Sequence, residues 1–276
     1  MATCTGLSCS IFPIPGNGTD PDEVPEEARL IDSWFLMSSP YPIATIVATY
    51  LYFVLKLGPQ YMSFRKPYDL KYIMMAYNLF QVVYNAWLFQ KVFHTQGAIT
   101  YIVEHTCMPA DKRENFFLRN ELFQAAWYYF FSKLADLLDT IFFVLRKKQS
   151  HVSFLHVYHH SMMLVSTWAY LKYIRGEQAG LIGLINSGVH VAMYSYYFLA
   201  ALGPAIQPYL WWKKYITKLQ LAQFIFIICL FTCLTVFNCE MPRKLTYYII
   251  ANGFVFLYLF TQFYFRSYLN KKQHSS

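Results

Sequence analysis

The chain has 276 residues and a formal net charge of +8, and 56% of its residues are hydrophobic while only 14% are charged. Because soluble domains carry about 25% charged residues, this balance excludes an ordinary soluble protein. Several stretches near 20 residues long are almost free of charge, which is the length that a helix needs to cross a bilayer. The composition therefore predicts an all-α, polytopic membrane protein.

Seven membrane-spanning helices are expected. They cover about residues 40–57, 72–93, 122–145, 152–174, 179–201, 215–237 and 245–268. The fourth and fifth contain polar residues that weaken their hydropathy, so a six-span arrangement stays open. The chain then divides into a tail at 1–36, a seven-helix domain at 37–268 and a second tail at 269–276.

Basic residues predict the orientation. With seven spans, one side of the membrane receives these basic residues against the single acid Asp69: Lys56, Arg65, Lys66, Lys71, Arg146, Lys147, Lys148, Lys213, Lys214, Lys218, Arg266, Lys271 and Lys272. Such a bias marks the cytosolic side and puts the N-terminus outside or in the lumen. These cations either meet anionic lipid or bind a phosphate-bearing substrate. The first 36 residues contain no basic region followed by an apolar one, so no cleavable signal peptide is expected.

The N-terminal tail is rich in Pro, Gly and Asp, which indicates disorder, and its Asn17-Gly18-Thr19 is a glycosylation acceptor on the lumenal side. The first span begins after Pro40 and is expected to end at Gly58-Pro59, a pair that stops helices. Cys107 and Cys239 fall in two loops on the lumenal side, where a disulfide persists, so we expect them to pair.

The second span carries Tyr77, Asn78, Gln81, Tyr84 and Asn85 at spacings that place them on one face. This polar stripe either forms an interhelical seam or lines a cavity. The loop of nearly thirty residues that follows is too long for a turn and predicts helical or lid structure on the lumenal side.

The third span carries three ionisable side chains, which a helix facing lipid would not tolerate. Lys133 and Asp136 lie three residues apart and can neutralise each other. Asp139 then needs a partner on another helix, and a histidine is the candidate that we expect.

Three histidines lie within six residues of the fourth span, at His156, His159 and His160. On a helix their rings fall within an arc of roughly 100°, so they face one place together. Histidine in a membrane span usually marks a functional site, although a packing role stays open for any one of them.

The fifth and sixth spans add polar residues at a similar depth. Asn186, His190, Met193 and Tyr197 are spaced four, three and four apart, and Tyr194 lies beside them. Thr217, Gln220 and Gln223 follow at intervals of three, where interhelical packing is the other interpretation. Polar groups from four helices therefore meet in the cytosolic half of the membrane.

These segments resemble the boxes of the very-long-chain fatty acid elongase family, the condensing enzymes of the endoplasmic reticulum. The similarity is carried in order by Lys133-Leu-Ala-Asp136-Leu-Leu-Asp139-Thr140, His156-Val-Tyr-His159-His160, Asn186 to Tyr197, and Thr217 to Gln223, and it covers the chain from Trp34 onward. Position 136 departs from the family pattern, which has Glu there. The shorter Asp136 is expected to hold Lys133 but to reach a neighbouring helix less well.

The resemblance implies condensation of a long-chain acyl-CoA with malonyl-CoA to a 3-ketoacyl-CoA, CO2 and CoA, with no cofactor. It also implies seven helices, six of them around an acyl-chain tunnel. Since no cysteine lies at the depth of the polar residues, His159 is the expected nucleophile, through an acyl-imidazole. His156 or His160 together with Asp139 would orient it, and His190 would polarise the thioester or enolate.

The remaining site residues are assigned to binding. Lys133, Asp136, Asn186, Tyr194, Tyr197, Gln220 and Gln223 would hold the reacting groups, and Lys147, Lys148, Lys213, Lys214 and Arg266 would bind the CoA phosphates. The expected partners are acyl-CoA, malonyl-CoA, membrane lipid and other enzymes of the elongation cycle, with a homo-oligomer left open and no nucleic acid. The expected location is the endoplasmic reticulum membrane.

Two other classes of protein compete with this interpretation. A di-iron desaturase or hydroxylase would use the histidines as ligands, because imidazole suits iron. It needs about eight histidines near one site, whereas only five of the eight here approach the cytosolic half, so no metal is expected. A seven-span receptor or a transporter is the non-enzymatic alternative, but receptor signatures and a clear internal repeat are both missing.

Overall fold

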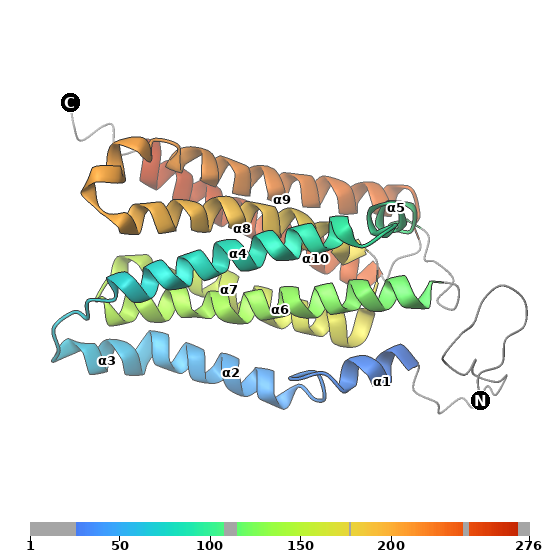
Figure 1. Cartoon of the computed structure of the whole chain (residues 1–276), viewed down its shortest axis with the longest axis horizontal. Helices are drawn as coiled ribbons and strands as arrows, with labels where there is room; N and C mark the ends of the chain where they lie inside the picture. The colour runs from blue at the N-terminus through green and yellow to red at the C-terminus, as the bar shows by residue number, and fades with distance from the viewer. Residues whose placement is uncertain (1–25, 108–114, 177, 240–242, 270–276) are drawn as a thin grey trace, which may run out of the picture.

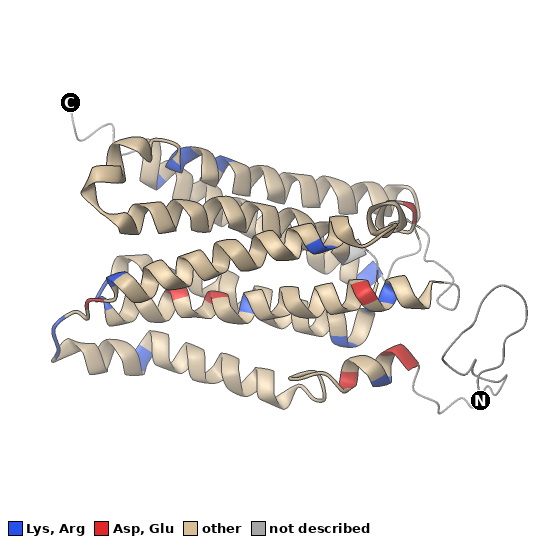
Figure 2. Cartoon of the chain, in the orientation of Figure 1, with Lys and Arg blue, Asp and Glu red and all other residues tan. Residues whose placement is uncertain are grey.

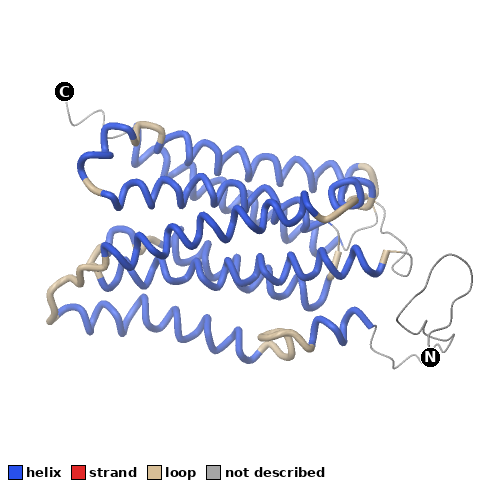
Figure 3. Tube along the Cα trace, viewed as in Figure 1, coloured by secondary structure: helices blue, strands red, loops and turns tan. Residues whose placement is uncertain are grey.

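The computed structural model describes residues 26–107, 115–176, 178–239 and 243–269, and within them every regular element is a helix (Figures 1 and 3). The chain begins there with the short α1 (Glu26–Asp32). Seven long helical segments then run back and forth as a bundle (Figure 1). Asn17, Cys4, Cys9, Lys271 and Lys272 lie outside the described residues.

The first long segment is continuous from Tyr41 to Ser63. It consists of α2 (Tyr41–Tyr52), a π-helical turn (Phe53–Leu57) and α3 (Gly58–Ser63). The predicted end at Gly58-Pro59 is therefore wrong. The wider turn carries the bond from the Gly58 amide to the Phe53 carbonyl, and Pro59 falls in the first turn of α3, where its missing donor costs little.

The next segments are α4 (Lys71–His94), α6 (Phe116–Leu145) and α7 (Phe154–Ala169), which continues as a π-helical turn (Tyr170–Ile174). The short α5 (Ala98–Glu104) lies in the long loop between α4 and α6, which agrees with the helical structure expected there. A 3-10 turn (Gln149–His151) joins α6 to α7.

The last three long segments are α8 (Gln178–Leu202), α9 (Lys213–Val236) and α10 (Arg243–Tyr264), which ends in a π-helical turn (Phe265–Leu269). A 3-10 turn (Pro204–Tyr209) joins α8 to α9. All seven predicted helices are present, and two of them, the continuous α2–α3 segment and α6, are longer than expected.

Three of the helical segments are long and apolar enough to cross a membrane by length and composition: Tyr41–Ser63, Lys213–Val236 and Arg243–Leu269. The other long helices, α4, α6, α7 and α8, carry the polar side chains that the bundle buries. Because these polar side chains are buried between helices, they do not contact the lipid.

Helix α2–α3 lies on the outside of the bundle against α6 and α7. A Cβ added to Gly58 would lie 2.6 Å from Val144 Cγ1, so only glycine allows this approach to α6. The Tyr50 hydroxyl lies 2.7 Å from Thr140 Oγ1 of α6 across the same interface.

The N-terminal segment is fixed to one end of the bundle. Lys172 Nζ donates to Asp32 Oδ1 at 2.6 Å and to the Met37 carbonyl at 2.8 Å. Arg119 of α6 forms a buried ion pair with Glu27 of α1, with Nε 2.7 Å from Oε1.

Cys107 and Cys239 form a disulfide that joins the segment after α5 to the end of α9, 132 residues later. The structure thus contains the predicted pair. Both cysteines lie at the same end of the bundle as α1, which agrees with the common side of the membrane inferred for them.

Candidate active site

Lys133 and Asp136 form an ion pair inside the bundle. They lie on one face of α6 because they are three residues apart, and Lys133 Nζ is 3.1 Å from Asp136 Oδ2. Their side chains are 1% and 2% exposed. The predicted self-neutralising pair is therefore confirmed.

Asp136 also bonds to two other helices. Its Oδ1 accepts hydrogen bonds from Gln81 Nε2 of α4 and from the Tyr194 hydroxyl of α8, both at 2.9 Å. The expectation that the shorter side chain reaches neighbouring helices poorly is wrong. α4 and α8 both pack close to this point of α6, so an aspartate is long enough.

Asp139 is bonded to a tyrosine. The Tyr194 hydroxyl oxygen lies 2.7 Å from Asp139 Oδ2, within hydrogen-bonding distance. The partner of Asp139 is thus a tyrosine in place of the predicted histidine, and the role of Asp139 in orienting His159 stays a prediction. The physical reason is the packing of α8, which places the Tyr194 ring between the two carboxylates of α6.

His190 of α8 contacts the charged pair. Its Nδ1 and Nε2 each lie 3.4 Å from Lys133 Nζ, and its Nδ1 lies 3.7 Å from Asp136 Oδ2. Together with Gln81 and Tyr77 of α4, the residues Lys133, Asp136, Asp139, His190 and Tyr194 are called the polar cluster below. It joins α4, α6 and α8, whereas the four spans expected to converge are α6, α7, α8 and α9.

The three histidines of α7 lie in its first two turns. The Ser153 hydroxyl caps this helix by accepting a hydrogen bond from the His156 amide, which fixes where the turns begin. The ring of His160 packs against both others, with centroids 4.3 Å from His156 and 5.4 Å from His159. The three rings therefore meet, as their spacing predicts.

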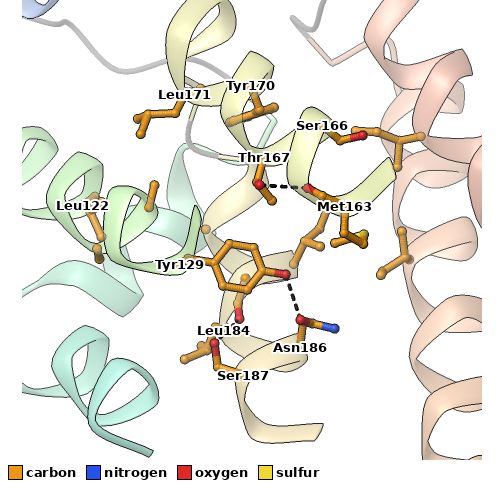
Figure 4. A pocket seen from close by; sticks show the side chains of 18 of the residues that line it. Leu122, Tyr129, Met163, Ser166, Thr167, Tyr170, Leu171, Leu184, Asn186 and Ser187 are labelled. Carbon is orange, nitrogen blue, oxygen red and sulfur yellow. Dashed lines mark hydrogen bonds between the residues drawn. The ribbon is translucent and has the colours of Figure 1, made fainter. Parts of the chain in front are cut away.

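An elongated apolar cavity of about 210 Å³ begins at His159. Six long helices line it, namely α4, α6, α7, α8, α9 and α10, with α5 at the far end. Figure 4 shows part of this lining, with Leu122, Met163, Leu171 and Leu184 among the labelled side chains. Among the described histidines, His159 is the one that lines it.

The far end of the cavity contains Arg119, Tyr101 and Arg175. Arg119 donates to Glu27, and its Nη1 lies 3.3 Å from the Tyr101 hydroxyl. Sixteen residue steps separate His159 from Arg175, of which the first ten lie in α7 and the others pass through the π-helical turn Tyr170–Ile174, so the distance is ~24 Å at 1.5 Å per residue. The cavity is thus long and narrow, with a histidine at one end and an ion pair at the other.

Asn186 and Gln223 also line the cavity, between its two ends. The Tyr129 hydroxyl donates to Asn186 Oδ1 at 2.8 Å (Figure 4), and Asn186 Nδ2 lies 3.5 Å from Gln223 Oε1. Tyr129 was missed by the sequence analysis. It lies four residues before Lys133 on α6, so the helical period contained the signal that places it on the same face.

Two other predicted binding residues lie away from the cavity lining. Gln220 Nε2 lies 3.5 Å from Met193 Sδ. Tyr197 packs its ring against Tyr194 and Tyr196 and is 41% exposed. Neither position lines the cavity that begins at His159.

The predicted phosphate-binding cations gather at the end of the bundle opposite α1. Lys147 Nζ donates to the Ser63 carbonyl at 3.3 Å, while Lys213 lies over the Tyr196 ring and Lys214 over the Tyr215 ring. Lys148 follows α6 and Arg266 lies in the last turn after α10. Figure 2 shows blue segments at this end, and red segments inside α6.

The cations at this basic end of the bundle affect His151. Burial and the cations Lys213, Lys148 and Arg146 lower the pKa of its imidazole below the ordinary value. The imidazole is therefore neutral at pH 7, and the positive potential around it suits an anion.

Within the described residues, no group of three or more His, Cys, Asp or Glu side chains is placed to hold a metal ion. The rings of the three histidines of α7 pack against one another in tilted and edge-on arrangements.

Comparison with known proteins agrees with the resemblance of these segments to the elongase boxes. Residues 35–276 match the model of the ELO, GNS1/SUR4 family. Human very long chain fatty acid elongase 4 is 41% identical over 246 residues, which are 89% of this chain and 77% of that protein. Rat very long chain fatty acid elongase 7 is 40% identical over 245 residues, or 86% and 84% of the two chains.

A very long chain fatty acid elongase of Aedes aegypti is 41% identical over 240 residues, which are 87% of this chain and 66%, just under two thirds, of that protein. The chain therefore belongs to the ELO (GNS1/SUR4) family of very long chain fatty acid elongases, multi-pass membrane proteins that act at the condensing step of fatty acid elongation.

Proposed function

We propose that this elongase condenses a long-chain acyl-CoA with malonyl-CoA through an acyl-imidazole on His159. The observation that carries the proposal is the position of His159 at the head of the apolar cavity. An acyl chain lying in the cavity would bring its thioester carbonyl to this ring. His156 and His160 have no place in the lining, so position distinguishes His159 among the three.

The first half of the reaction transfers the acyl group. A ring nitrogen of His159 attacks the thioester carbon, the C–S bond breaks, and the proton of the imidazole leaves with CoA. Imidazole suits this role because it is neutral near pH 7 and has a free electron pair. The ring of His160 packs edge-on against His159 and holds it in place, and Phe256 of α10 also packs edge-on against His159 at 5.1 Å.

The second half joins the two carbon chains. Malonyl-CoA loses CO2, and the resulting enolate carbon attacks the acyl carbon on His159, which releases a 3-ketoacyl-CoA. Negative charge develops on the enolate oxygen during this step. In this proposal Lys133 and His190 of the polar cluster stabilise that charge as donors.

The cavity supplies the site for the acyl chain. An extended chain advances about 1.2 Å per bond, so the ~24 Å between His159 and Arg175 holds roughly 20 carbons. Apolar walls favour the chain by about 0.8 kcal/mol for each buried methylene. Asn186 and Gln223 lie beside this path and would orient the carbonyl groups near its head.

All seven long helical segments cross the membrane in this proposal, and α4 and α6–α10 surround the acyl chain. The N-terminal tail and the disulfide face the lumen of the endoplasmic reticulum, and Asn17 is then an acceptor for glycosylation. Lys147, Lys148, Lys213, Lys214 and Arg266 face the cytosol, where they bind the phosphates of CoA. The bias of basic residues toward this end supports the orientation.

The test is incubation of the purified enzyme with acyl-CoA alone. One equivalent of CoA should be released, and mass spectrometry of peptides should find one acyl group on His159. His159→Ala should abolish both signals, while His94→Ala, an exposed histidine outside the site, should keep them. Retention of condensation in His159→Ala, or a wild-type enzyme that releases no CoA, contradicts the proposal.

A further inference from the structure

The second half-reaction consumes a proton. When the enolate takes the acyl group, the C–N bond to His159 breaks and leaves its electron pair on the imidazole nitrogen. Neither reactant supplies a proton, because the malonyl carboxylate is ionised near pH 7 and leaves as CO2. One proton per turnover must therefore reach this buried site from water.

The Tyr194 hydroxyl lies between two carboxyl groups. Its oxygen is 2.9 Å from Asp136 Oδ1 and 2.7 Å from Asp139 Oδ2. A tyrosine hydroxyl has one hydrogen, so it can donate to only one carboxylate at a time. The second short contact is a hydrogen bond only when the other carboxyl group carries a proton and donates it to the Tyr194 oxygen. The geometry therefore fits three groups that share two protons.

Short distances continue from this trio to Lys133 and His190. Asp136 Oδ2 lies 3.1 Å from Lys133 Nζ and 3.7 Å from His190 Nδ1. Lys133 Nζ lies 3.4 Å from both ring nitrogens of His190. A proton that enters at Asp139 can thus reach His190 without crossing a gap wider than these distances.

The trio also has a direction. Asp139 lies three residues beyond Asp136 on α6, or ~4.5 Å nearer the end of the helix at Arg146. Asp136 is almost fully buried, with 2% exposure, whereas Asp139 is only partly buried. Asp139 is therefore the member closest to the solvent at the basic end of the bundle.

We propose that Asp139, Tyr194 and Asp136 form a proton relay that recharges His190 for the second half-reaction. This inference rests on the acyl-imidazole intermediate proposed above. A proton from water first binds Asp139. The Tyr194 hydroxyl then gives its hydrogen to Asp136 and takes the proton from Asp139. Finally, Lys133 or His190 takes the proton from Asp136. His190 then donates it to the nitrogen of His159 as the product leaves.

Other polar groups around the relay hold it in place. The Tyr77 hydroxyl of α4 lies 3.2 Å from the Ala135 carbonyl and 3.3 Å from the Tyr194 hydroxyl, and it accepts from Gln81 Nε2 at 2.9 Å. Tyr77 therefore belongs to the hydrogen-bonded group around the Tyr194 oxygen. From α2, Tyr50 is bonded to Thr140, and from α8 the ring of Tyr197 packs against Tyr194. Lys133 and His190 are the charged and titratable neighbours on the far side from Asp139.

Separate measurement of the two half-reactions tests the relay. The first, CoA release from acyl-CoA alone, needs no proton from outside, whereas the second, CO2 release from the preformed acyl-enzyme and malonyl-CoA, needs one. Asp139→Asn and Tyr194→Phe should slow the second half-reaction by about 10²-fold or more, in the range of general acid–base effects. They should leave the first within about twofold.

A pH profile and a matched control complete the design. The residual second half-reaction of Asp139→Asn should accelerate as the pH falls, because protons must then arrive by another path, and Asp139→Glu should restore part of the rate. Tyr84→Phe is the control, since it removes a hydroxyl that donates to the Tyr128 carbonyl away from the cluster. Thermal unfolding of each variant verifies that it is folded.

Equal slowing of both half-reactions in folded variants overturns the relay, because a structural role would have that effect. Unchanged rates of the second half-reaction in both variants also overturn it. A wild-type enzyme that releases no CoA from acyl-CoA alone refutes the intermediate itself, and with it the place given to the relay. The two proposals thus fail in different measurements.

Discussion

The polar cluster and the apolar cavity adjoin at Tyr129, whose ring lines the cavity and contacts Lys133, but the two regions are built in opposite ways. In the cluster, Asp136 alone bonds to partners on α4, α6 and α8, so each position depends on the others. The cavity is formed by side chains such as Leu122, Met163 and Ile227, which contact an acyl chain without direction. The directional hydrogen bonds of the cluster fix the positions of the reacting groups. The apolar walls of the cavity can accept acyl chains of different lengths.

The largest expected effect comes from breaking the cluster at its buried ion pair. Lys133→Met leaves the Asp136 charge without its cation, which should lower the free energy of unfolding by about 3–5 kcal/mol and abolish condensation. Thermal unfolding in detergent and CO2 release measure the two effects. Adding Asp136→Leu should recover most of the stability but none of the activity. Recovered activity in the double variant would show that the pair has no part in the chemistry.

A smaller effect is expected from changing the cavity without touching the cluster. A Cβ added to Gly183 would lie 3.7 Å from the Tyr129 ring, so Gly183→Leu extends a side chain into the cavity without a clash. Each methylene of the acyl chain that the leucine displaces from the cavity loses about 0.8 kcal/mol of binding free energy from apolar burial. We expect the longest acyl-CoA substrates to lose kcat/KM by about tenfold or more while short ones keep theirs.

The control for this variant is Ala251→Leu, which adds a leucine at an exposed position of α10. It should not alter the profile of kcat/KM against acyl chain length. An unchanged profile in Gly183→Leu would place the acyl chain outside this cavity.

Tyr129 connects the two regions, because its ring lines the cavity and lies 4.8 Å from Lys133 Nζ of the polar cluster. Tyr129→Phe leaves the Asn186 oxygen without its hydroxyl donor, at a cost of about 1–3 kcal/mol for a buried group. Because the ring and its contact with Lys133 stay, we expect kcat to fall for all chain lengths alike. A loss confined to long acyl chains would instead show that the hydroxyl acts only on binding of the acyl chain.

The smallest effect is expected at the basic end of the bundle. Lys147→Ala should raise the KM for acyl-CoA a few-fold with little change in kcat, since exposed ion pairs contribute about 0.2–1 kcal/mol. The increase should shrink at high salt because screening already weakens the contact. Lys244→Ala, an exposed change at the other end of the bundle, should leave KM unchanged. A loss of kcat in Lys147→Ala would contradict a binding role.

The sequence predicts the helices well because hydrophobic length and helical period are local properties. The Lys133–Asp136 pair follows from a spacing of three residues, and the meeting of the three histidine rings follows from one helical face. The disulfide between Cys107 and Cys239 follows from counting the crossings between them. Each of these inferences needs only one segment or its order in the chain.

Partners between helices are harder to predict because they depend on the rotation and depth of each helix in the bundle. The sequence places Asp139 and the histidines at similar depth, yet the packing of α8 puts Tyr194 next to Asp139. Likewise, spacing cannot decide which of the histidines faces a cavity, because that cavity is bounded by six different helices. The extra turn at Pro59 escaped prediction because a π-helical turn removes the usual cost of proline in a helix.

The ion pair between Glu27 and Arg119 has a consequence for biosynthesis. The two residues are 92 positions apart, and Lys172, which ties down the end of α1, comes 140 positions after Asp32. At 5–20 residues per second, Glu27 waits about 5–18 seconds for its partner to be synthesised. The end of the cavity farthest from His159 can therefore close only after α6 and α7 have been made, so the first helix of the described chain docks later than helices that follow it in the sequence.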